Sequence, residues 1–267
     1  MDLQTTLPLH TGNRMPVLGL GTWQLTHDTA GTVARALELG YPMIDTSSDY
    51  GTQPGIGEAV RRTAVARDAF YLVAKVEETD DAYAATGAYL AELGLDYADL
   101  VLIHRPPADG VGAGLWEGLR QAKREGLTRD IGVSNYSLEQ MRALEAATGE
   151  RPAVNQVEWS PFGHSRAFLE ACREAGIVIQ AYSPLTRGTR LDDPVLNAVA
   201  ARHGKSPAQV LIRWNLQRGT VPLPKANRLD HLEENIRVFD FVLDGVDLAR
   251  LDGLNEEYSA LGSLPYV

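Results

Sequence analysis

The strongest constraint on the fold of this sequence is a repeated alternation of short apolar runs with helical segments. Eight runs rich in Val, Ile and Leu read as parallel strands buried on both faces: MPVLGLG, YPMID, AFYLVAK, DLVLIH, TRDIGVSN, AVNQVEW, IVIQAYS and TVPLPK. Between them, apolar residues from Ala30 to Leu37 follow helical spacing, and Ser206-Pro207-Ala208-Gln209 form a capping box with proline at the first helical position. Eight strand–helix units without a linker predict an α/β fold, a single (β/α)8 TIM barrel over residues 1–267.

Two further features refine this prediction. The segment LPLHTGNRMPVLGLG predicts an N-terminal β-hairpin that turns at Thr11-Gly12-Asn13, ahead of the first barrel strand. The single Cys172 lies on the apolar face of a predicted helix, so we interpret it as a core residue and not as a catalytic thiol. One cysteine excludes an intrachain disulfide and fits a reducing cytoplasm.

Charge and hydropathy restrict the partners. The formal net charge is -10 and the sequence has no basic run, which argues against nucleic acid and anionic membranes. The start MDLQTTLPLH lacks the features of a secretion signal, and no apolar run approaches the roughly 20 residues that span a bilayer. We therefore expect a cytoplasmic, monomeric protein that acts on a small molecule, and the sequence indicates no metal site.

Polar residues end nearly every predicted strand. Asp45, Lys75 and His104 end three successive strands, and the later strands end at Ser134-Asn135, Gln156 with Glu158, Tyr182-Ser183, and Lys225. In barrels of this class the C-terminal ends of all strands open onto one face, where the active site lies. Solvated loops explain one or two such positions, but they explain poorly a carboxylate, an ammonium and an imidazole on adjacent strands.

These three side chains, together with Tyr50 in the stretch MIDTSSDYG, predict a particular chemistry. A free phenol titrates near ~10 and is a poor acid at neutral pH. We expect the Lys75 ammonium to lower the pKa of Tyr50, Asp45 to hold Lys75, and His104 to donate a hydrogen bond to a carbonyl oxygen. The set suits moving a proton at an oxygen while a hydride moves at its carbon. Acyl transfer is disfavoured because no serine or cysteine is paired with a base.

The chain resembles the aldo-keto reductase superfamily, including its bacterial aldehyde and 2,5-diketo-gluconate reductases. Motifs in the family's order cover almost the whole chain: MPVLGLGTW, GYPMIDTSSDYG, LVAK, DLVLIHRP, GLTRDIGVSNYSLEQM, PAVNQVEWSPF, GIVIQAYSPL and SPAQVLIRWNLQRGTVPLPKANRLDHLEEN. The resemblance implies the barrel fold and NADP(H)-dependent reduction of aldehydes and ketones. It assigns the family's catalytic tetrad to Asp45, Tyr50, Lys75 and His104, with Tyr50 as the proton donor and the nicotinamide as the hydride source.

The resemblance also implies where the cofactor lies. Gly19-Leu20-Gly21-Thr22 is no Rossmann fingerprint, since the third glycine is missing, and the family binds its cofactor extended across the barrel mouth. The nicotinamide end would contact Ser134, Asn135 and Gln156, with Tyr182 stacked on the ring and Ser183 and Leu185 along the pyrophosphate. Lys225 would meet the adenosine phosphate, and Glu234 and Asn235 the adenine. The remaining expected contacts are Thr22, Trp23, Asp45, Ala208, Ala226, Asn227, Arg228 and His231.

Two of these positions depart from the family's commonest pattern. Ala226 stands where a serine often sits, and His231 where an arginine often clamps the 2′-phosphate. Histidine is the weaker anion partner because it is mostly uncharged at neutral pH and cannot bind bidentately. Arg228 would compensate, so we expect NADP(H) to be preferred with NAD(H) not fully excluded. Alternatively, His231 is a solvated helix residue.

The expected substrate pocket is formed by Trp23, Tyr50, Glu77, His104 and Arg105, although Trp23 also fits a core position. Many relatives carry aromatic residues where this chain has Glu77 and Arg105. We hypothesise that the two residues pair across the mouth and favour small or polar carbonyls; the alternative is that both point to solvent. The short segments RPPADGVGAG and SALGSLPYV predict an open pocket.

Two other function classes stay open at this point. The first is a cofactor-binding regulatory module, because relatives of this fold serve as accessory subunits of ion channels. The intact tetrad argues against it. The second is an unrelated barrel enzyme in which Lys225 meets a substrate phosphate.

Overall fold

Eight parallel strands form one sheet in the order β10-β9-β8-β7-β6-β5-β4-β3 in the computed structural model, which describes residues 1–25 and 27–267. The strands are β3 (Leu20–Gly21), β4 (Met43–Asp45), β5 (Tyr71–Val76), β6 (Ala98–Ile103), β7 (Thr128–Ser134), β8 (Val154–Glu158), β9 (Val178–Tyr182) and β10 (Val221–Pro222). Hydrogen bonds from Gly19 N to Pro222 O and from Gly21 N to Pro224 O, both 3.1 Å, join the first strand to the last. The sheet therefore closes, and the predicted (β/α)8 barrel is confirmed.

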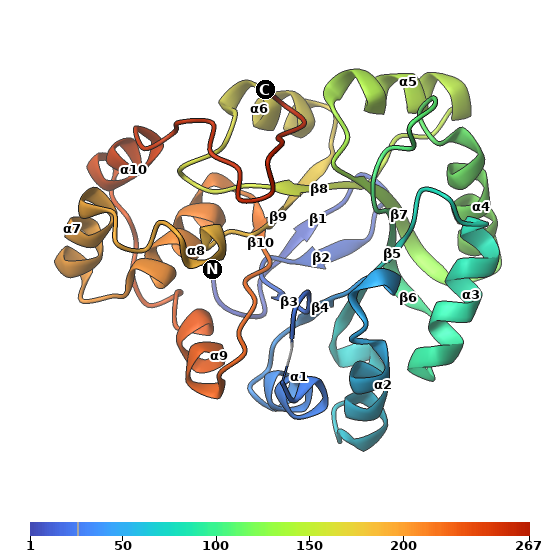
Figure 1. The fold of residues 1–267 in the computed structure, drawn as a ribbon, viewed down its shortest axis with the longest axis horizontal. Helices are drawn as coiled ribbons and strands as arrows, with labels where there is room; N and C mark the ends of the chain where they lie inside the picture. The colour runs from blue at the N-terminus through green and yellow to red at the C-terminus, as the bar shows by residue number, and fades with distance from the viewer. Residues whose placement is uncertain (26) are drawn as a thin grey trace.

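Helices surround this sheet as a ring (Figure 1). They are α1 (Thr29–Glu38), α2 (Gln53–Arg62), α3 (Ala82–Leu93), α4 (Ala113–Arg124), α5 (Leu138–Thr148), α6 (Arg166–Glu174), α7 (Pro194–His203), α8 (Pro207–Arg218), α9 (Leu229–Ile236) and α10 (Gly245–Asp252). Helices α1 to α6 each connect one strand to the next, whereas α7 and α8 together connect β9 to β10. Short 3₁₀ turns η1 (Ser48–Tyr50), η2 (Arg67–Ala69) and η3 (Thr186–Gly188) lie in the connecting loops.

Local sequence signals set the helix ends. At the start of α8, Gln209 N donates to Ser206 Oγ over 3.2 Å, and Ser206 N donates to Gln209 Oε1 over 3.1 Å. This is the predicted capping box, and such a cap stabilises a helix by about 1 kcal/mol. Gly40, which follows α1, has a φ of +84°, a backbone conformation that glycine adopts without steric cost.

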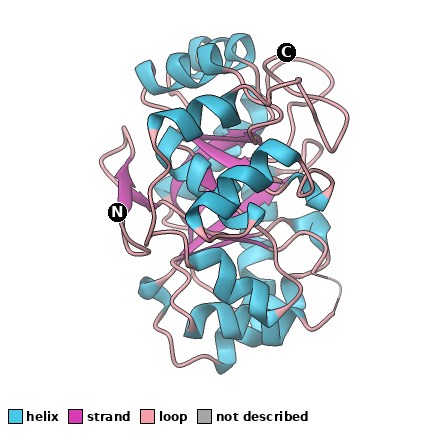
Figure 2. Cartoon of the chain, turned by 90° about the vertical axis from the view of Figure 1, so that its left-hand side faces the viewer, coloured by secondary structure: helices cyan, strands magenta, loops and turns pink. Residues whose placement is uncertain are grey.

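The predicted hairpin is also present, as antiparallel strands β1 (Thr6–Pro8) and β2 (Arg14–Pro16). Its turn contains Gly12 at a φ of +93° and a 2.9 Å hydrogen bond from Leu9 N to Asn13 O. Leu9 and Met15 are buried in one cluster with residues at the beginnings of the barrel strands, including Met43 and Tyr71. The hairpin thus covers the N-terminal end of the barrel, and Figure 2 shows it at the end opposite the loops beside the C-terminus.

The predicted first strand Met15–Gly21 is wrong in extent, because the structure divides it between β2 and β3. Pairing with the hairpin extends to Val17, whose N donates to Thr5 O over 3.1 Å, and from Gly19 onward the backbone bonds to the last barrel strand instead.

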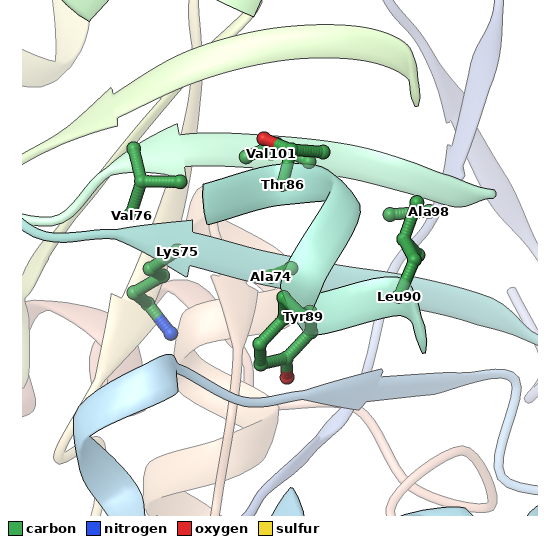
Figure 3. A pocket seen from close by; sticks show the side chains of 8 residues that line it. All are labelled: Ala74, Lys75, Val76, Thr86, Tyr89, Leu90, Ala98 and Val101. Atoms are coloured by element: carbon green, nitrogen blue, oxygen red, sulfur yellow. The ribbon is translucent and has the colours of Figure 1, made fainter. Parts of the chain in front are cut away.

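The core continues between the sheet and its helices. Figure 3 shows α3 packed over β5 and β6, with Tyr89 near Ala74, Leu90 near Ala98, and the Lys75 ammonium directed toward the segment that follows β4. The gap between these side chains is too small to hold a water molecule, so it is a packing defect and not a ligand site. Cys172 is fully buried, as predicted for a core residue, and burial raises its pKa to about 12. Within the described residues, no helix has the length and apolarity required to span a membrane.

Candidate active site

The four predicted tetrad residues meet at the C-terminal end of three neighbouring strands. Asp45 is the last residue of β4, Lys75 is the fifth residue of β5, and His104 follows β6 directly. Strands β4, β5 and β6 are adjacent and parallel, so their C-terminal ends lie on the same side of the barrel. Tyr50 reaches this group from η1, the turn that follows β4.

Lys75 and Asp45 form a buried ion pair. Lys75 Nζ lies 2.8 and 2.9 Å from the two Asp45 carboxylate oxygens and donates a third hydrogen bond, of 3.0 Å, to Thr46 O. The side chains are 0% and 5% exposed. Gln156 Nε2 donates to Asp45 Oδ1 over 2.7 Å. A buried pair of charges persists only where its remaining hydrogen-bonding capacity is also met, as it is here.

The phenol ring of Tyr50 lies close to both the ammonium and the imidazole. Lys75 Nζ is 5.0 Å from the centre of the Tyr50 ring, and the Tyr50 and His104 rings are 5.8 Å apart at 70°. Burial raises the pKa of Tyr50 well above its usual value of 10.0, and the charges of Asp45 and Asp49 raise it further. The expectation that Lys75 lowers this pKa is therefore wrong, because loss of hydration of the phenolate dominates. At neutral pH Tyr50 is a fully protonated phenol.

His104 is held by polar groups on the strand and turn beside it. Its Nδ1 lies 2.7 Å from Glu77 Oε1, 3.2 Å from Ser47 Oγ and 3.6 Å from Asp49 Oδ1. Burial lowers the pKa of His104 to about 4, with the positive charges of Lys75 and Arg105 acting in the same direction. The ring is therefore neutral at pH 7.

Glu77 and Arg105 form the ion pair that the sequence hypothesis requires. Arg105 Nη1 lies 2.7 Å from Glu77 Oε2, and its Nη2 lies 3.2 Å from Asp49 Oδ2. The Glu77 side chain is only 20% exposed, so the alternative that both residues point to solvent does not hold for Glu77. Burial and the nearby Asp49 charge raise the pKa of Glu77. Ligand atoms of Asp49, Glu77 and His104 all lie within 4.8 Å of one another, and the positive charge that bridges the two carboxylates is the Arg105 guanidinium.

Residues expected at the nicotinamide end lie beside the tetrad on β7, β8 and β9. Ser134 Oγ donates to Gln156 O over 2.8 Å, Asn135 Nδ2 donates to His104 O over 3.1 Å, and the Tyr182 hydroxyl donates to Asn135 Oδ1 over 2.8 Å. One network thus connects these side chains to one another and to Asp45 through Gln156.

Backbone strain marks the same region. Asn135 and Ser183 have φ values of +64° and +47°, in the left-handed region that favours glycine. Such conformations cost about 1–3 kcal/mol and cluster at functional sites.

The adenosine end was expected between β10 and α9. Lys225 is exposed and makes no ion pair with a carboxylate of residues 1–25 or 27–267. Partial burial lowers the pKa of Lys225, and so does the charge of Arg187. The side chain of Asn235 is buried and its Nδ2 has no hydrogen-bond partner in the described chain. Since adenine offers ring nitrogens as acceptors, and phosphates seek unpaired cations, both positions fit the expected adenosine moiety.

The other residues expected at the adenosine end lie on α8, on α9 and on the segment between β10 and α9. Ala208 lies in α8 next to Gln209, whose Nε2 donates to Glu234 O over 3.1 Å and joins α8 to α9. Ala226 is buried and Asn227 half-buried, whereas His231 is exposed. Arg228, expected to bind the 2′-phosphate, is instead paired with Asp230, its Nε lying 2.9 Å from Asp230 Oδ1. This pair lowers the pKa of Asp230 to about 2.

A further basic residue, Arg187 in η3, was missed by the sequence reasoning. Its guanidinium carbon lies 4.5 Å from the centre of the half-buried Trp23 ring, and its Nη2 donates to Gln24 Oε1 over 3.3 Å. Thr22 is buried beside Trp23, and its hydroxyl donates to Asp45 O over 2.9 Å. Arg187 therefore joins the loop that contains Ser183 and Leu185 to the segment that follows β3. Nothing in the stretch PLTRGTR indicates this contact, because it depends on how two distant loops meet.

Comparison with known proteins places the chain in one family. The family model described as "Aldo/keto reductase family" matches residues 17–256. An aldo-keto reductase of Mycobacterium sp. (strain MCS) is 39% identical over 257 residues, which cover 94% of this chain and 91% of the relative. Glyoxal reductase of Bacillus subtilis (strain 168) is 37% identical over 262 residues, covering 96% and 95%. The crystal structure of a Bombyx mori aldo-keto reductase in complex with NADP superposes with a TM-score of 0.90 at 30% identity, covering 97% of this chain and 95% of that one.

The barrel, the buried Lys75–Asp45 pair beside Tyr50 and His104, and these similarities agree with one another, and this chain belongs to the aldo/keto reductase family.

Proposed function

We propose that this protein is an NADP(H)-dependent oxidoreductase that reduces aldehydes and ketones to alcohols, with Tyr50 as the proton donor. One observation carries the proposal: a protonated phenol has a buried ammonium 5.0 Å from its ring centre and an imidazole ring 5.8 Å away. Carbonyl reduction needs this pairing of a proton donor with positive charge where the oxygen becomes negative.

The residues have separate roles in this proposal. Reduced nicotinamide, when bound, supplies the hydride to the carbonyl carbon. Tyr50 donates its proton to the carbonyl oxygen as negative charge develops there, and Lys75 stabilises the phenolate that remains. Asp45 holds Lys75 in place through two hydrogen bonds of 2.8 and 2.9 Å. Ser134, Asn135 and Gln156 would hold the carboxamide, and Tyr182 would stack on the ring.

The proposed cofactor preference is for NADP(H). The solved Bombyx mori relative is a complex with NADP, and Lys225 together with Arg187 provides positive charge for phosphates. Because Arg228 is engaged by Asp230 and a histidine such as His231 cannot bind a phosphate bidentately, we expect NAD(H) to be accepted with lower efficiency.

The proposed substrates are small or polar carbonyls. Glu77 and Arg105 place a charged pair at the mouth, where a large apolar substrate would have to remove water from both groups. A relative with 37% identity is a glyoxal reductase, which is consistent with dicarbonyls as a substrate class.

The test is a screen of NADPH oxidation over small aldehydes, ketones, keto-sugars and dicarbonyls, combined with quenching of cofactor fluorescence on mixing. The proposal expects quenching and steady oxidation with at least one substrate class. Quenching without turnover would favour the regulatory module instead. Absence of quenching would favour the barrel enzyme that binds a substrate phosphate.

A further inference from the structure

Glu77 touches the catalytic histidine but was considered so far only as a pocket residue. Among the described residues, all hydrogen bonds and ion pairs of the His104 ring are made at Nδ1, and the shortest, 2.7 Å, is to Glu77 Oε1. Ser47 Oγ donates to the same Glu77 oxygen over 3.2 Å, and Arg105 Nη1 donates to the other over 2.7 Å. Each carboxylate oxygen of Glu77 thus accepts a hydrogen bond from a donor outside the ring, and the Arg105 guanidinium adds the positive charge that favours an ionised carboxylate.

We propose that Glu77 is a positioning residue that keeps the proton of the neutral His104 ring on Nδ1, so that Nε2 meets the substrate as a hydrogen-bond acceptor. A neutral imidazole carries one proton, and an ionised carboxylate 2.7 Å from Nδ1 requires that proton there. Nε2 becomes a donor only when the ring takes up a second proton. This inference rests on the proposed function, because it concerns how the same site receives a carbonyl oxygen.

Reduction and oxidation require opposite protonation states at His104 Nε2. A carbonyl oxygen accepts hydrogen bonds, so His104 can assist Tyr50 there only through Nε2–H, which requires the doubly protonated ring. An alcohol can donate its hydroxyl proton to an unprotonated Nε2. Reduction should therefore become more efficient as the pH falls toward the pKa of His104, which burial lowers to about 4, and oxidation should not.

Groups on every side of His104 affect this titration. Positive charges that oppose protonation are Lys75 on β5 and Arg105 next in the chain. Negative charges that favour it are Glu77, 2.7 Å from Nδ1, Asp45 at the end of β4 and Asp49 in η1. Tyr50 faces the ring edge-on, but its pKa is raised well above 10.0, so it does not titrate near neutrality. A decline in reduction between about pH 6 and 9 would therefore come from the histidine and not from the phenol.

The substitution Glu77→Gln separates this role from simple packing. The glutamine amide has the same shape as the glutamate carboxylate. Its oxygen would accept from Arg105, because a guanidinium only donates, and its NH₂ group would then face His104 Nδ1. A donor at that position requires an unprotonated Nδ1, so the neutral ring would carry its proton on Nε2. The variant should therefore reverse the tautomer. Glu78→Gln is the matched control, because Glu78 lies 3.6 Å from the same Arg105 and makes no contact with the ring.

Long-range ¹H–¹⁵N NMR of histidine-labelled protein reads the tautomer directly, with the His104 signals identified by their loss in His104→Asn. We expect the Nδ1–H form in the wild type and in Glu78→Gln, and the Nε2–H form in Glu77→Gln. The proposal is overturned if the wild type carries the Nε2–H form, as it would with a protonated Glu77, or if Glu77→Gln leaves the tautomer unchanged. This measurement needs no turnover, so it stays decisive even if the reductase function fails.

Kinetics provides the second readout. For carbonyl reduction, kcat/KM of the wild type and of Glu78→Gln should fall by up to about tenfold per pH unit between about pH 6 and 9. In Glu77→Gln it should change by less than about twofold per unit, since Nε2–H is then available without proton uptake. Equal slopes in Glu77→Gln and the wild type would refute the role of Glu77 while leaving the reductase function intact.

Discussion

The tetrad end and the adenosine end of the barrel mouth differ in how their polar groups are satisfied. Lys75 and Asp45 are buried, and the protein itself provides their hydrogen bonds. At the other end, Lys225 is exposed without a carboxylate partner in the described chain, and the buried Asn235 Nδ2 lacks any partner there. At the tetrad end, the protein itself therefore satisfies the buried charges before any ligand binds. At the adenosine end, it leaves Lys225 and Asn235 without partners in the described chain, and a bound ligand would provide them. Substitutions at the first end should affect folding and turnover, and substitutions at the second should affect affinity.

The largest effect is expected from Lys75→Met. It leaves Asp45 as a buried charge without its partner, which should lower the free energy of unfolding by about 3–5 kcal/mol. Urea denaturation measures this loss. The double variant Lys75→Met/Asp45→Asn removes both charges and should recover much of the stability without recovering turnover. If the single variant were as stable as the wild type, the buried pair would not be the structural centre of this end.

A smaller effect is expected from the pH dependence of stability. The pKa of His104 is about 4 in the folded protein, below its ordinary value of 6.5, so the folded state binds fewer protons than the unfolded state in this window. His104 thus stabilises the fold fully above 6.5, and this contribution, on the order of 3 kcal/mol, is lost as the pH falls from 6.5 toward 4. Urea titrations of the wild type and His104→Gln over this range measure the difference. Parallel curves would contradict the low pKa.

At the adenosine end, Lys225→Ala should weaken NADPH binding by about tenfold, because one hydrogen bond between charged groups is lost. The thermal stability should hardly change, since the side chain is exposed and carries no ion pair within the described residues. Fluorescence titration measures the affinity. Lys123→Ala is the control, because Lys123 is paired with Glu150 on another part of the surface. Equal affinities of both variants would remove Lys225 from the cofactor site.

The smallest effect concerns cofactor choice. Asp230→Asn should release Arg228 from its pair and remove a negative charge near the expected 2′-phosphate. The ratio of kcat/KM for NADPH over NADH should then rise by about three- to tenfold, and Arg228→Ala should lower it. If neither variant changes the ratio, the 2′-phosphate is recognised elsewhere.

The same contrast explains which features could be predicted from the sequence. The meeting of Asp45, Lys75 and His104 follows from topology alone, since the C-terminal ends of parallel strands share one side of the barrel. The capping box at Ser206 depends only on residues close in sequence, so it could also be predicted. Sequence could not give the pKa of Tyr50, because the degree of burial depends on side chains from several elements.

Three contacts near the site were not predicted from the sequence, each for a different reason. The pairing of Arg228 with Asp230 joins residues two positions apart, so it was visible in the sequence and was overlooked in favour of an expected ligand contact. Ser47, which contacts both His104 and Glu77, lies two residues after Asp45 in the stretch that ends a strand, and that position was its only signal. Arg187 depends on the packing of two distant loops and had no signal at all.

The most direct test of the central claim is a single-turnover reaction in which enzyme saturated with NADPH is mixed with a small dicarbonyl. NADPH absorbance is followed for the wild type and for Tyr50→Phe, and the affinity of each for NADPH is measured separately. We expect the variant to bind NADPH within about threefold of the wild type and to oxidise it at least about 10²-fold more slowly. Oxidation at the wild-type rate by Tyr50→Phe would contradict the assignment of Tyr50 as the proton donor.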